Sequence, residues 1–396
     1  MDYDLDSVLS PSVDLLAFGE PTHLEPAFAW TRNDLLARLA DRGFRSIALE
    51  SDRVAALLVD EYVRADVGTL DTAMRDGFSH GFGELEANRH LVAWMREYNE
   101  GRPVEQQLAF YGFDAPTEMV NVPGPRSYLE HVRDYLRLDL DLADLLGADE
   151  RWHRTEAVMD PAESPGASPE AGVVRALADD MSEQLYTRAP ELVARSSRAE
   201  WVRCETHVIA GLGLLRYHRL AAQPLEQEDR WTRMCALRDV LMAQNLLHIR
   251  RIEALRGPTL IFANNRHLQR NPSTMRLGEM HLGWHSAGAV VGSVVGPRYS
   301  LILGSLGRDE LIGLPEPDPR TYEGFLQTRM TAPGPIAPAE IPAADIRADH
   351  GPDHGYFPLD RASIDAADLI LHIPDGSAVR GAGPAIRGDY GSRHIP

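Results

Sequence analysis

Short apolar runs alternate with amphipathic stretches over the first 115 residues, and this alternation constrains the fold more than any other feature of the chain. The strand-like runs lie at 15–18, 47–49 and 108–111. The stretches between them carry apolar residues at helical spacing, and each run ends in a polar residue. Strands that alternate with helices are typical of βα units, so the pattern predicts a mainly parallel sheet.

The hydrophobic period becomes helical almost throughout residues 116–256, and runs of strand length return after residue 258. The later runs lie at 259–262, 289–291, 300–303 and 369–372. We therefore predict a three-layer α/β core whose mainly parallel sheet uses both ends of the chain, with a large helical insertion. The predicted parts are the first half of the core at 1–115, the insertion or lid at 116–257, and the second half of the core at 258–396.

Two segments are rich in proline. The tract at 160–169 is polar as well as proline-rich, which favours a mobile surface loop. The tract at 314–358 combines proline with alanine, and it is interpreted as loops that cover the core without being part of it.

All basic residues of the chain are arginines, because the 40 Lys and Arg residues include no lysine. The absence of lysine excludes enzymes that form a Schiff base on lysine and phosphate-binding loops that need one. The 59 acidic residues give a formal net charge of −19. This excess of negative charge repels phosphate backbones and anionic lipids, so we expect no nucleic-acid partner and no membrane binding.

The cysteines, Cys204 and Cys235, lie in stretches with helical periodicity and have no Cys-x-x-Cys spacing. We therefore expect neither a disulfide framework nor a cysteine zinc site, and we assign a reducing, cytoplasmic compartment. The amino terminus is acidic, and the sequence contains no apolar stretch of about 18 residues. These features predict neither a signal peptide nor a membrane span.

Polar residues with acid/base chemistry follow four of the expected strands. They are Glu20 with His23, then Glu50, then Asp114, and finally the segment 264–267 with the sequence NNRH. Because ligands bind outside the carboxyl ends of parallel strands, these side chains are expected to line one cleft. A histidine beside carboxylates suits general acid/base catalysis, since imidazole titrates near neutral pH.

Several motifs occur with a specific order and spacing. They are FGEPTH at 18–23, Arg32, GFRSIALE at 43–50, FYGFD at 110–114 and FANNRH at 262–267. In order and spacing they resemble the erythromycin esterase family, over roughly residues 12–305. No serine lies in a Gly-x-Ser-x-Gly turn at Ser293 or Ser305, which disfavours a serine hydrolase.

The resemblance implies a hydrolase that cleaves an ester or lactone without a metal, a cofactor or a covalent serine. It makes His23 the general base that activates water, while Glu20 and Glu50 orient and support that histidine. His267 and Arg32 would hold the substrate or the oxyanion that forms on attack. The further candidates for contact with a small hydrophobic substrate are Asp114, Asn264 and Asn265.

Several positions depart from the family pattern, at Pro21, Leu24 and Ala27 in the first motif and at Asn264 in the last. The family's Trp-Ala-His-Asn-x-His element has a histidine where this chain has Asn264. A neutral amide cannot transfer protons as imidazole does, so two alternatives to hydrolysis stay open. The first is elimination, cyclisation or acyl transfer on a biosynthetic intermediate in the same pocket. The second is a catalytically silent protein that binds a ligand.

Other residues that could carry chemistry have simpler interpretations. Arg238 and Asp239 are adjacent in a helical stretch and are interpreted as an internal salt-bridge pair. His80 and His285 are possible cleft residues. A divalent ion could be held by the acid/base set itself, but the chain has no His-Glu-x-x-His helix or other dedicated metal spacing. The sequence does not fix an oligomeric state.

Overall fold

The computed structural model describes residues 8–23, 25–65, 67–117, 122–350, 355–381 and 384. Within these residues, seven strands form one sheet in the order β3-β2-β4-β1-β7-β9-β8. Neighbouring strands are parallel, except that β8 runs antiparallel to β9. The strands are β1 (Leu15–Glu20), β2 (Ser46–Asp52), β3 (Ala109–Asp114), β4 (Thr259–Asn264), β7 (Tyr299–Arg308), β8 (Gly334–Ile336) and β9 (Leu369–Asp375).

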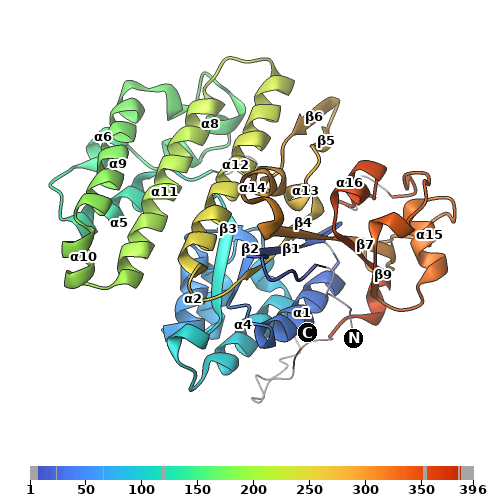
Figure 1. Cartoon of the computed structure of the whole chain (residues 1–396). Helices are drawn as coiled ribbons and strands as arrows, with labels where there is room; N and C mark the ends of the chain where they lie inside the picture. Colours follow the sequence, from blue (N-terminus) through green and yellow to red (C-terminus); the bar gives the residue numbers. More distant parts are fainter. Residues whose placement is uncertain are drawn as a thin grey trace, which may run out of the picture.

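Helices cover both faces of this sheet and make the core a three-layer α/β structure (Figure 1). Successive strand residues point to opposite faces, so Leu16 and Phe18 of β1 enter one apolar core while Leu15 and Ala17 enter the other. The first core is covered by α1 (Ala27–Asp41), α2 (Ala56–Ala65), α3 (Leu70–Asp76) and α4 (Glu86–Asn99). The second is covered by α12 (Gln227–Glu253), α13 (Asn265–Leu268), α14 (Ala287–Val295), α15 (Tyr322–Arg329) and α16 (Arg361–Ala366). The predicted fold class is confirmed.

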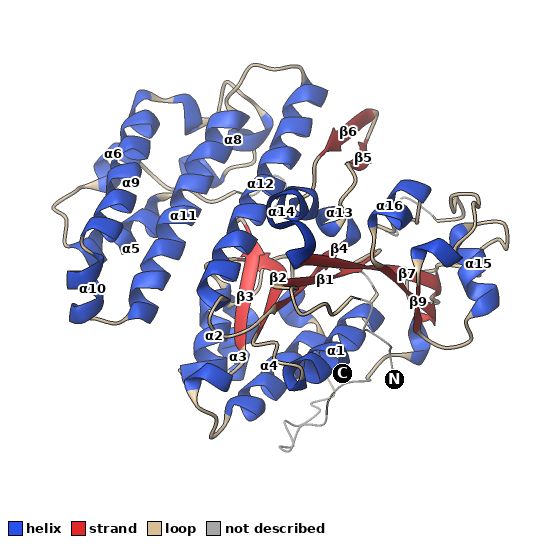
Figure 2. Cartoon of the chain, in the orientation of Figure 1, coloured by secondary structure: helices blue, strands red, loops and turns tan. Residues whose placement is uncertain are grey.

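The chain between β3 and α12 is helical and lies to one side of the sheet (Figure 2). Its helices are α5 (Arg126–Leu136), α6 (Leu142–Leu146), α7 (Glu150–His153), α8 (Glu156–Met159), α9 (Pro169–Thr187), α10 (Ala189–Arg195) and α11 (Arg198–Ala221). They pack around an apolar core of their own that includes Trp152, Met181 and Trp201. The large helical stretch therefore forms as predicted, while its division from the rest of the chain as a separate domain stays a prediction.

The strand predicted at 289–291 is wrong, because these residues lie in the middle of α14. The Ser286 side chain accepts a hydrogen bond from the Ala289 backbone N–H and caps the helix. α14 is apolar along most of its length and packs against the sheet. A short apolar run has no period of its own, so it does not distinguish a buried helix from a buried strand.

The proline-rich segments are more ordered than the sequence suggests. Residues 314–358 supply β8 and α15, and the buried Arg347 side chain donates to the carbonyls of Leu306 and Gly307 in β7. The interpretation of this tract as cover outside the core is therefore wrong. In the tract at 160–169, Pro165 is buried and Gly166 packs against the backbone of α11, so this part is anchored rather than mobile.

A two-stranded hairpin of β5 (Ser273–Leu277) and β6 (Met280–Trp284) stands beside α12 and outside the main sheet (Figure 1). Together with α11 and α12 it encloses a small apolar cluster around Tyr217, Trp231 and Trp284. The hairpin was not among the predicted strands. In the described part of the chain, no helix combines the length and the apolar character needed to cross a membrane.

Candidate active site

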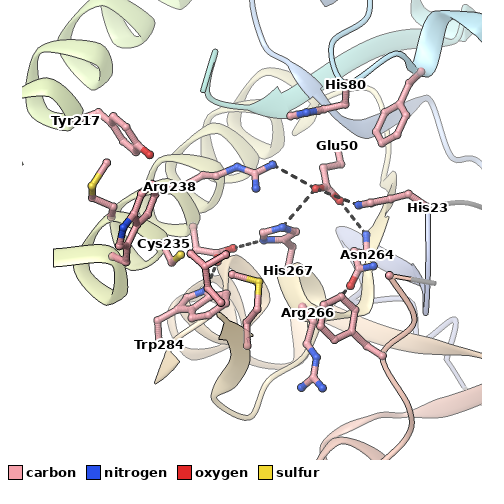
Figure 3. Close-up of a pocket in the computed structure, with 18 residues that line it drawn as sticks. His23, Glu50, His80, Tyr217, Cys235, Arg238, Asn264, Arg266, His267 and Trp284 are labelled. Carbon is pink, nitrogen blue, oxygen red and sulfur yellow. Dashed lines mark hydrogen bonds and ion pairs between the residues drawn. The ribbon is translucent and has the colours of Figure 1, made fainter. Parts of the chain in front are cut away.

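A cavity of about 520 Å³ lies beside the carboxyl ends of β1, β2 and β4, at the sheet edge where the sequence predicts a cleft (Figure 3). The term "the cavity" refers to this space throughout. Its acidic and basic lining residues are His23, Glu50, His80, Arg238, Asp239, Arg266 and His267, and the Cys235 thiol also lines it. Its apolar walls include Phe82, Tyr217, Trp231, Met234, Met275, Leu277, Trp284 and Phe357. An apolar cavity with a few convergent charged groups is typical of a small-molecule site.

Glu50, at the carboxyl end of β2, is the centre of the charged groups (Figure 3). Its Oε2 accepts a hydrogen bond of 2.9 Å from the Asn264 backbone N–H. Its Oε1 lies 3.3 Å from His267 Nε2, 3.3 Å from the Arg238 guanidinium and 3.7 Å from His23 Nε2. Burial raises the pKa of the Glu50 carboxyl, but the three cationic neighbours lower it more, so the net shift is downward.

His23 lies directly after β1, and its side chain is 34% exposed, which leaves the ring accessible. Its Nδ1 is 2.7 Å from Glu20 Oε1, and its ring stands 5.2 Å from the ring of Phe82. Burial lowers the pKa of His23, but the carboxylates of Glu50 and Glu20 raise it more, to about 9. The imidazole is therefore predominantly protonated at neutral pH.

Glu20 and Arg32 lie behind His23 and do not line the cavity. Burial raises the pKa of the Glu20 carboxyl in spite of the hydrogen bond with His23. Arg32 is 1% exposed, donates to the Asn33 side chain and stacks on Phe262 with 4.8 Å between guanidinium carbon and ring centre. Burial lowers the pKa of Arg32 to about 9. The geometry thus places Arg32 away from a ligand in the cavity.

His267 is held between two carboxylates. Its Nδ1 is 2.8 Å from Asp239 Oδ1, while its Nε2 faces Glu50. Asp239 also accepts hydrogen bonds from the Trp284 indole N–H and from the backbone N–H of Ala287 at the start of α14. Burial lowers the pKa of His267, but Asp239 and Glu50 raise it more, so this imidazole too favours its charged form. One acidic residue of α12 thereby orients the histidine, the hairpin and α14.

Asp114, at the end of β3, is fully buried and does not line the cavity. It receives two hydrogen bonds from the Arg238 guanidinium, at 3.1 and 2.5 Å, and lies 3.0 Å from His80 Nε2. These partners hold the pKa of the Asp114 carboxyl well below its usual range although burial raises it. His80 has a positive φ of 58°, a backbone conformation that is uncommon outside glycine and aims its ring at the cavity edge.

The two asparagines after β4 have different surroundings. Asn264 lines the cavity, and its side-chain oxygen accepts a hydrogen bond from the Arg266 backbone N–H, which caps α13. Asn265 does not line the cavity. Its amide donates to the Gly304 carbonyl and accepts from the Gly304 N–H, so it ties α13 to β7 in the interior.

The sequence profile of the erythromycin esterase family matches residues 39–364, which is most of the chain. The chain belongs to the erythromycin esterase family. Membership supports an esterase-like hydrolase that acts on ester bonds. The match contains Glu50, Asp239 and His267 but begins after Glu20 and His23, whose place in the site rests on their contacts with each other and with Glu50.

Solved structures share the fold at low sequence identity. An Asn-for-His mutant of the erythromycin esterase EreC in its open conformation has a TM-score of 0.64 and 16% identity, over 94% of this chain and 92% of that chain. A succinoglycan biosynthesis protein has a TM-score of 0.67 and 14% identity, over 94% and 89% of the two chains. A Bacillus cereus protein has a TM-score of 0.65 and 16% identity, over 93% and 90%. A comparison with curated proteins finds no match.

The structure brings some of the expected site residues together and separates others. His23, Glu50, Asn264 and His267 meet at the cavity, Glu20 and Asp114 touch it only through partners, and Arg32 and Asn265 lie apart from it. His80 lines the cavity as the sequence suggests, whereas the exposed His285 does not.

Sequence reasoning missed the roles of Arg238 and Asp239. They do not form an internal pair, because Arg238 binds Glu50 and Asp114 while Asp239 binds His267 and Trp284. The signal was the position of both charges within a long, largely buried helix. Buried charges need partners of opposite sign, and these partners lie on other elements.

A metal site does not emerge from the described residues, among which no group of three or more His, Cys, Asp and Glu side chains is arranged to hold an ion. The candidate ligands from the sequence are held by other partners: His23 binds Glu20, and His267 binds Asp239. Glu50 is already engaged by a backbone N–H and by cationic side chains.

Proposed function

We propose that this member of the erythromycin esterase family hydrolyses an ester or lactone of a hydrophobic natural product, with water activated by His23 and without a metal. One observation carries the proposal. A partly exposed histidine at a largely apolar cavity is held on Nδ1 by the Glu20 carboxylate, and its Nε2 lies 3.7 Å from Glu50 Oε1, beyond hydrogen-bond distance. This is the arrangement that general-base catalysis needs.

The proposed reaction starts from neutral His23. Its Nδ1–H donates to Glu20, which leaves the lone pair on Nε2 to accept a proton from water. The water oxygen attacks the ester carbonyl, and the N–H groups of His267 and Arg238 are the candidates to stabilise the resulting oxyanion. Protonated His23 then returns its proton to the leaving alkoxide, which departs as the alcohol while the acid is released.

Asn264 favours a second candidate, in which the same cavity and His23 catalyse an elimination, a cyclisation or an acyl transfer. The amide lines the cavity at a position where it offers no titratable proton, and its oxygen is occupied by the cap of α13. The substitution Asn264→His tests this point. A gain of esterase activity would favour hydrolysis weakened by the asparagine, and no gain would favour the second candidate.

The first experiment incubates the protein with a panel of macrolactones and simple esters and detects, by mass spectrometry, products heavier by one water. For an accepted substrate, His23→Ala is expected to reduce turnover by about 10²–10⁴-fold, the usual contribution of a general base. Substrate affinity, measured by calorimetry, should change little. His285→Ala is the matched control, because this exposed histidine does not line the cavity.

Two outcomes would contradict the proposal. Turnover that survives in the His23→Ala protein would remove His23 from the mechanism. Ligands that bind with no chemical change, in a protein whose folding is verified by circular dichroism, would indicate the catalytically silent binding protein instead.

A further inference from the structure

Arg266 differs from the other basic side chains of the cavity. His23, His80, His267 and Arg238 each contact at least one carboxylate. Arg266 lines the same cavity, yet its guanidinium forms no ion pair and no hydrogen bond with the described residues. Among the described residues, therefore, no carboxylate pairs directly with this positive charge.

The guanidinium is half-buried against an apolar wall. Its carbon lies 4.9 Å from the ring centre of Phe357, which also lines the cavity. Its Nε is buried without an acceptor. Burial lowers the pKa of Arg266, and Asp360 compensates only in part. The Asp360 carboxylate, which accepts from the Ser363 N–H at the start of α16, forms no ion pair with Arg266.

Stacking on Phe357 does not satisfy such a group. A cation–π contact at a partly exposed site contributes about 0.5–1 kcal/mol, whereas a buried N–H without an acceptor costs about 1–3 kcal/mol. A ligand oxygen cannot reach the enclosed Nε, but it can accept from the terminal N–H groups of the same guanidinium, which are not enclosed. Arginine presents its N–H groups in a planar fork that matches carboxylate and phosphate oxygens.

The position of Arg266 is fixed relative to the reacting groups. It precedes His267 on the single turn of α13, and the Asn264 side chain caps that turn at the Arg266 N–H. Adjacent residues on a helix point about 100° apart, so His267 joins Glu50 and Asp239 while Arg266 turns to Phe357 (Figure 3). An anion bound by Arg266 would thus be held at a constant offset from the groups around Glu50.

We propose, on the basis of the ester-hydrolase function above, that Arg266 binds an oxyanion of the substrate, so that the preferred ester carries a carboxylate or phosphate on an apolar body. The apolar body would pack against the aromatic and aliphatic walls, with the anion on the Phe357 side. An ester of the same shape with a neutral or cationic group at that end would gain nothing from Arg266.

Calorimetry with probes that cannot be hydrolysed tests this assignment without any turnover. The probes are 2-naphthoate, 2-naphthylphosphonate and, as the neutral comparison, 2-naphthamide. We expect at least one anionic probe to bind the unaltered protein about tenfold or more tightly than the amide, as a charge-assisted pair in a half-buried site should. The better anion identifies carboxylate or phosphate as the natural group.

Arg266→Met keeps the aliphatic stem against Phe357 and removes the charge. It should abolish the preference for the anion while amide affinity stays within about twofold, and Arg266→Lys should restore part of the preference. Arg276→Met is the matched control, because it removes one positive charge from the exposed face of the neighbouring β5. Thermal unfolding of each variant verifies the fold.

Equal affinity for acid and amide in the unaltered protein, no binding of any probe, or a preference that survives Arg266→Met would overturn the assignment. The binding preference measured by calorimetry does not depend on whether the protein hydrolyses esters. A preference lost in Arg266→Met, together with unchanged turnover in His23→Ala, would retain the anion subsite and reject His23 as the general base. The reverse pattern would reject the subsite alone.

Discussion

At the scale of single residues, the charges around Glu50 form a connected set of ion pairs. Glu50 faces His23, His267 and Arg238, and Arg238 continues to Asp114. Each carboxylate keeps its cationic neighbours charged, and each cation keeps the carboxylates ionised. The balance gives the site a preorganised polar environment within an apolar cavity, which is the condition for strong electrostatic stabilisation of a developing charge.

The raised pKa of His23 gives a pH dependence with a definite sign. A general base must be neutral, and His23 is protonated below about pH 9. We therefore expect kcat/KM to rise about tenfold per pH unit towards a plateau above about pH 9. A pH–rate profile of the free enzyme with a neutral ester measures this limb. A profile that falls as the pH rises would exclude His23 as the base.

Glu20→Gln provides a matched test of the same residue. It removes the hydrogen-bonded carboxylate that raises the pKa of His23, and it keeps a side chain of the same size. The rise of kcat/KM with pH should move to lower pH, because the His23 imidazolium loses one of its stabilising charges. The plateau rate should fall as well, since a neutral amide fixes the tautomer less firmly. An unchanged pH–rate profile would show that Glu20 does not raise the pKa of His23.

At the scale of elements, the β5–β6 hairpin forms part of the cavity wall. Side chains alternate along β5, so Met275 and Leu277 line the cavity while Thr274 and Arg276 are exposed. Trp284 at the end of β6 is anchored to Asp239 of α12. The hairpin thus joins the helical segment to the turn that bears Arg266 and His267.

Shortening the two apolar side chains of β5 should weaken substrate binding. Each buried methylene contributes about 0.8 kcal/mol, so the double substitution Met275→Ala with Leu277→Ala should raise the KM of a hydrophobic ester about tenfold or more, with little change in kcat. Steady-state kinetics measure the effect, and Thr274→Ala on the outer face is the control. An unchanged KM would mean that substrates do not reach this wall.

At the scale of the whole molecule, the sheet joins segments that are far apart in the sequence. β1 lies between β4 and β7, so an amino-terminal strand is central to a sheet completed by the last third of the chain. The close packing of β7 against β1 and α1 at the centre of the sheet depends on Gly304. A Cβ added there would lie 2.3 Å from the Gly19 carbonyl oxygen and 2.7 Å from the Phe28 ring.

Gly304→Ala should therefore destabilise the entire protein by about 1–3 kcal/mol, because the backbone of β1 cannot yield without disturbing its neighbours. Urea unfolding measures the change. Gly172→Ala is the opposite control: it lies within α9 with open space around the added Cβ and should stabilise by about 0.5–1 kcal/mol. Equal effects of the two substitutions would contradict the packing at the centre of the sheet.

The sequence by itself determined the fold class and the sheet edge at which the candidate site lies. Apolar runs that end in Glu20, Glu50, Asp114 and Asn264 are strands of a parallel sheet, and the carboxyl ends of such strands lie at one edge. That rule is enough to bring Glu50 and His267 to one cavity. The rule holds for parallel strands in almost any order, so it can be applied to the sequence before the strand order is known.

Only the tertiary structure decided which charges meet and which segments join the core. Arg238 pairs with residues more than a hundred positions away, Asp239 pairs with His267 and with a hairpin that the sequence did not predict, and Arg32 turns into the interior. β8 contains Pro335, which disfavours a strand but is tolerated at a sheet edge. Local patterns record which residues are apolar or charged, whereas partners and edges depend on how distant elements pack.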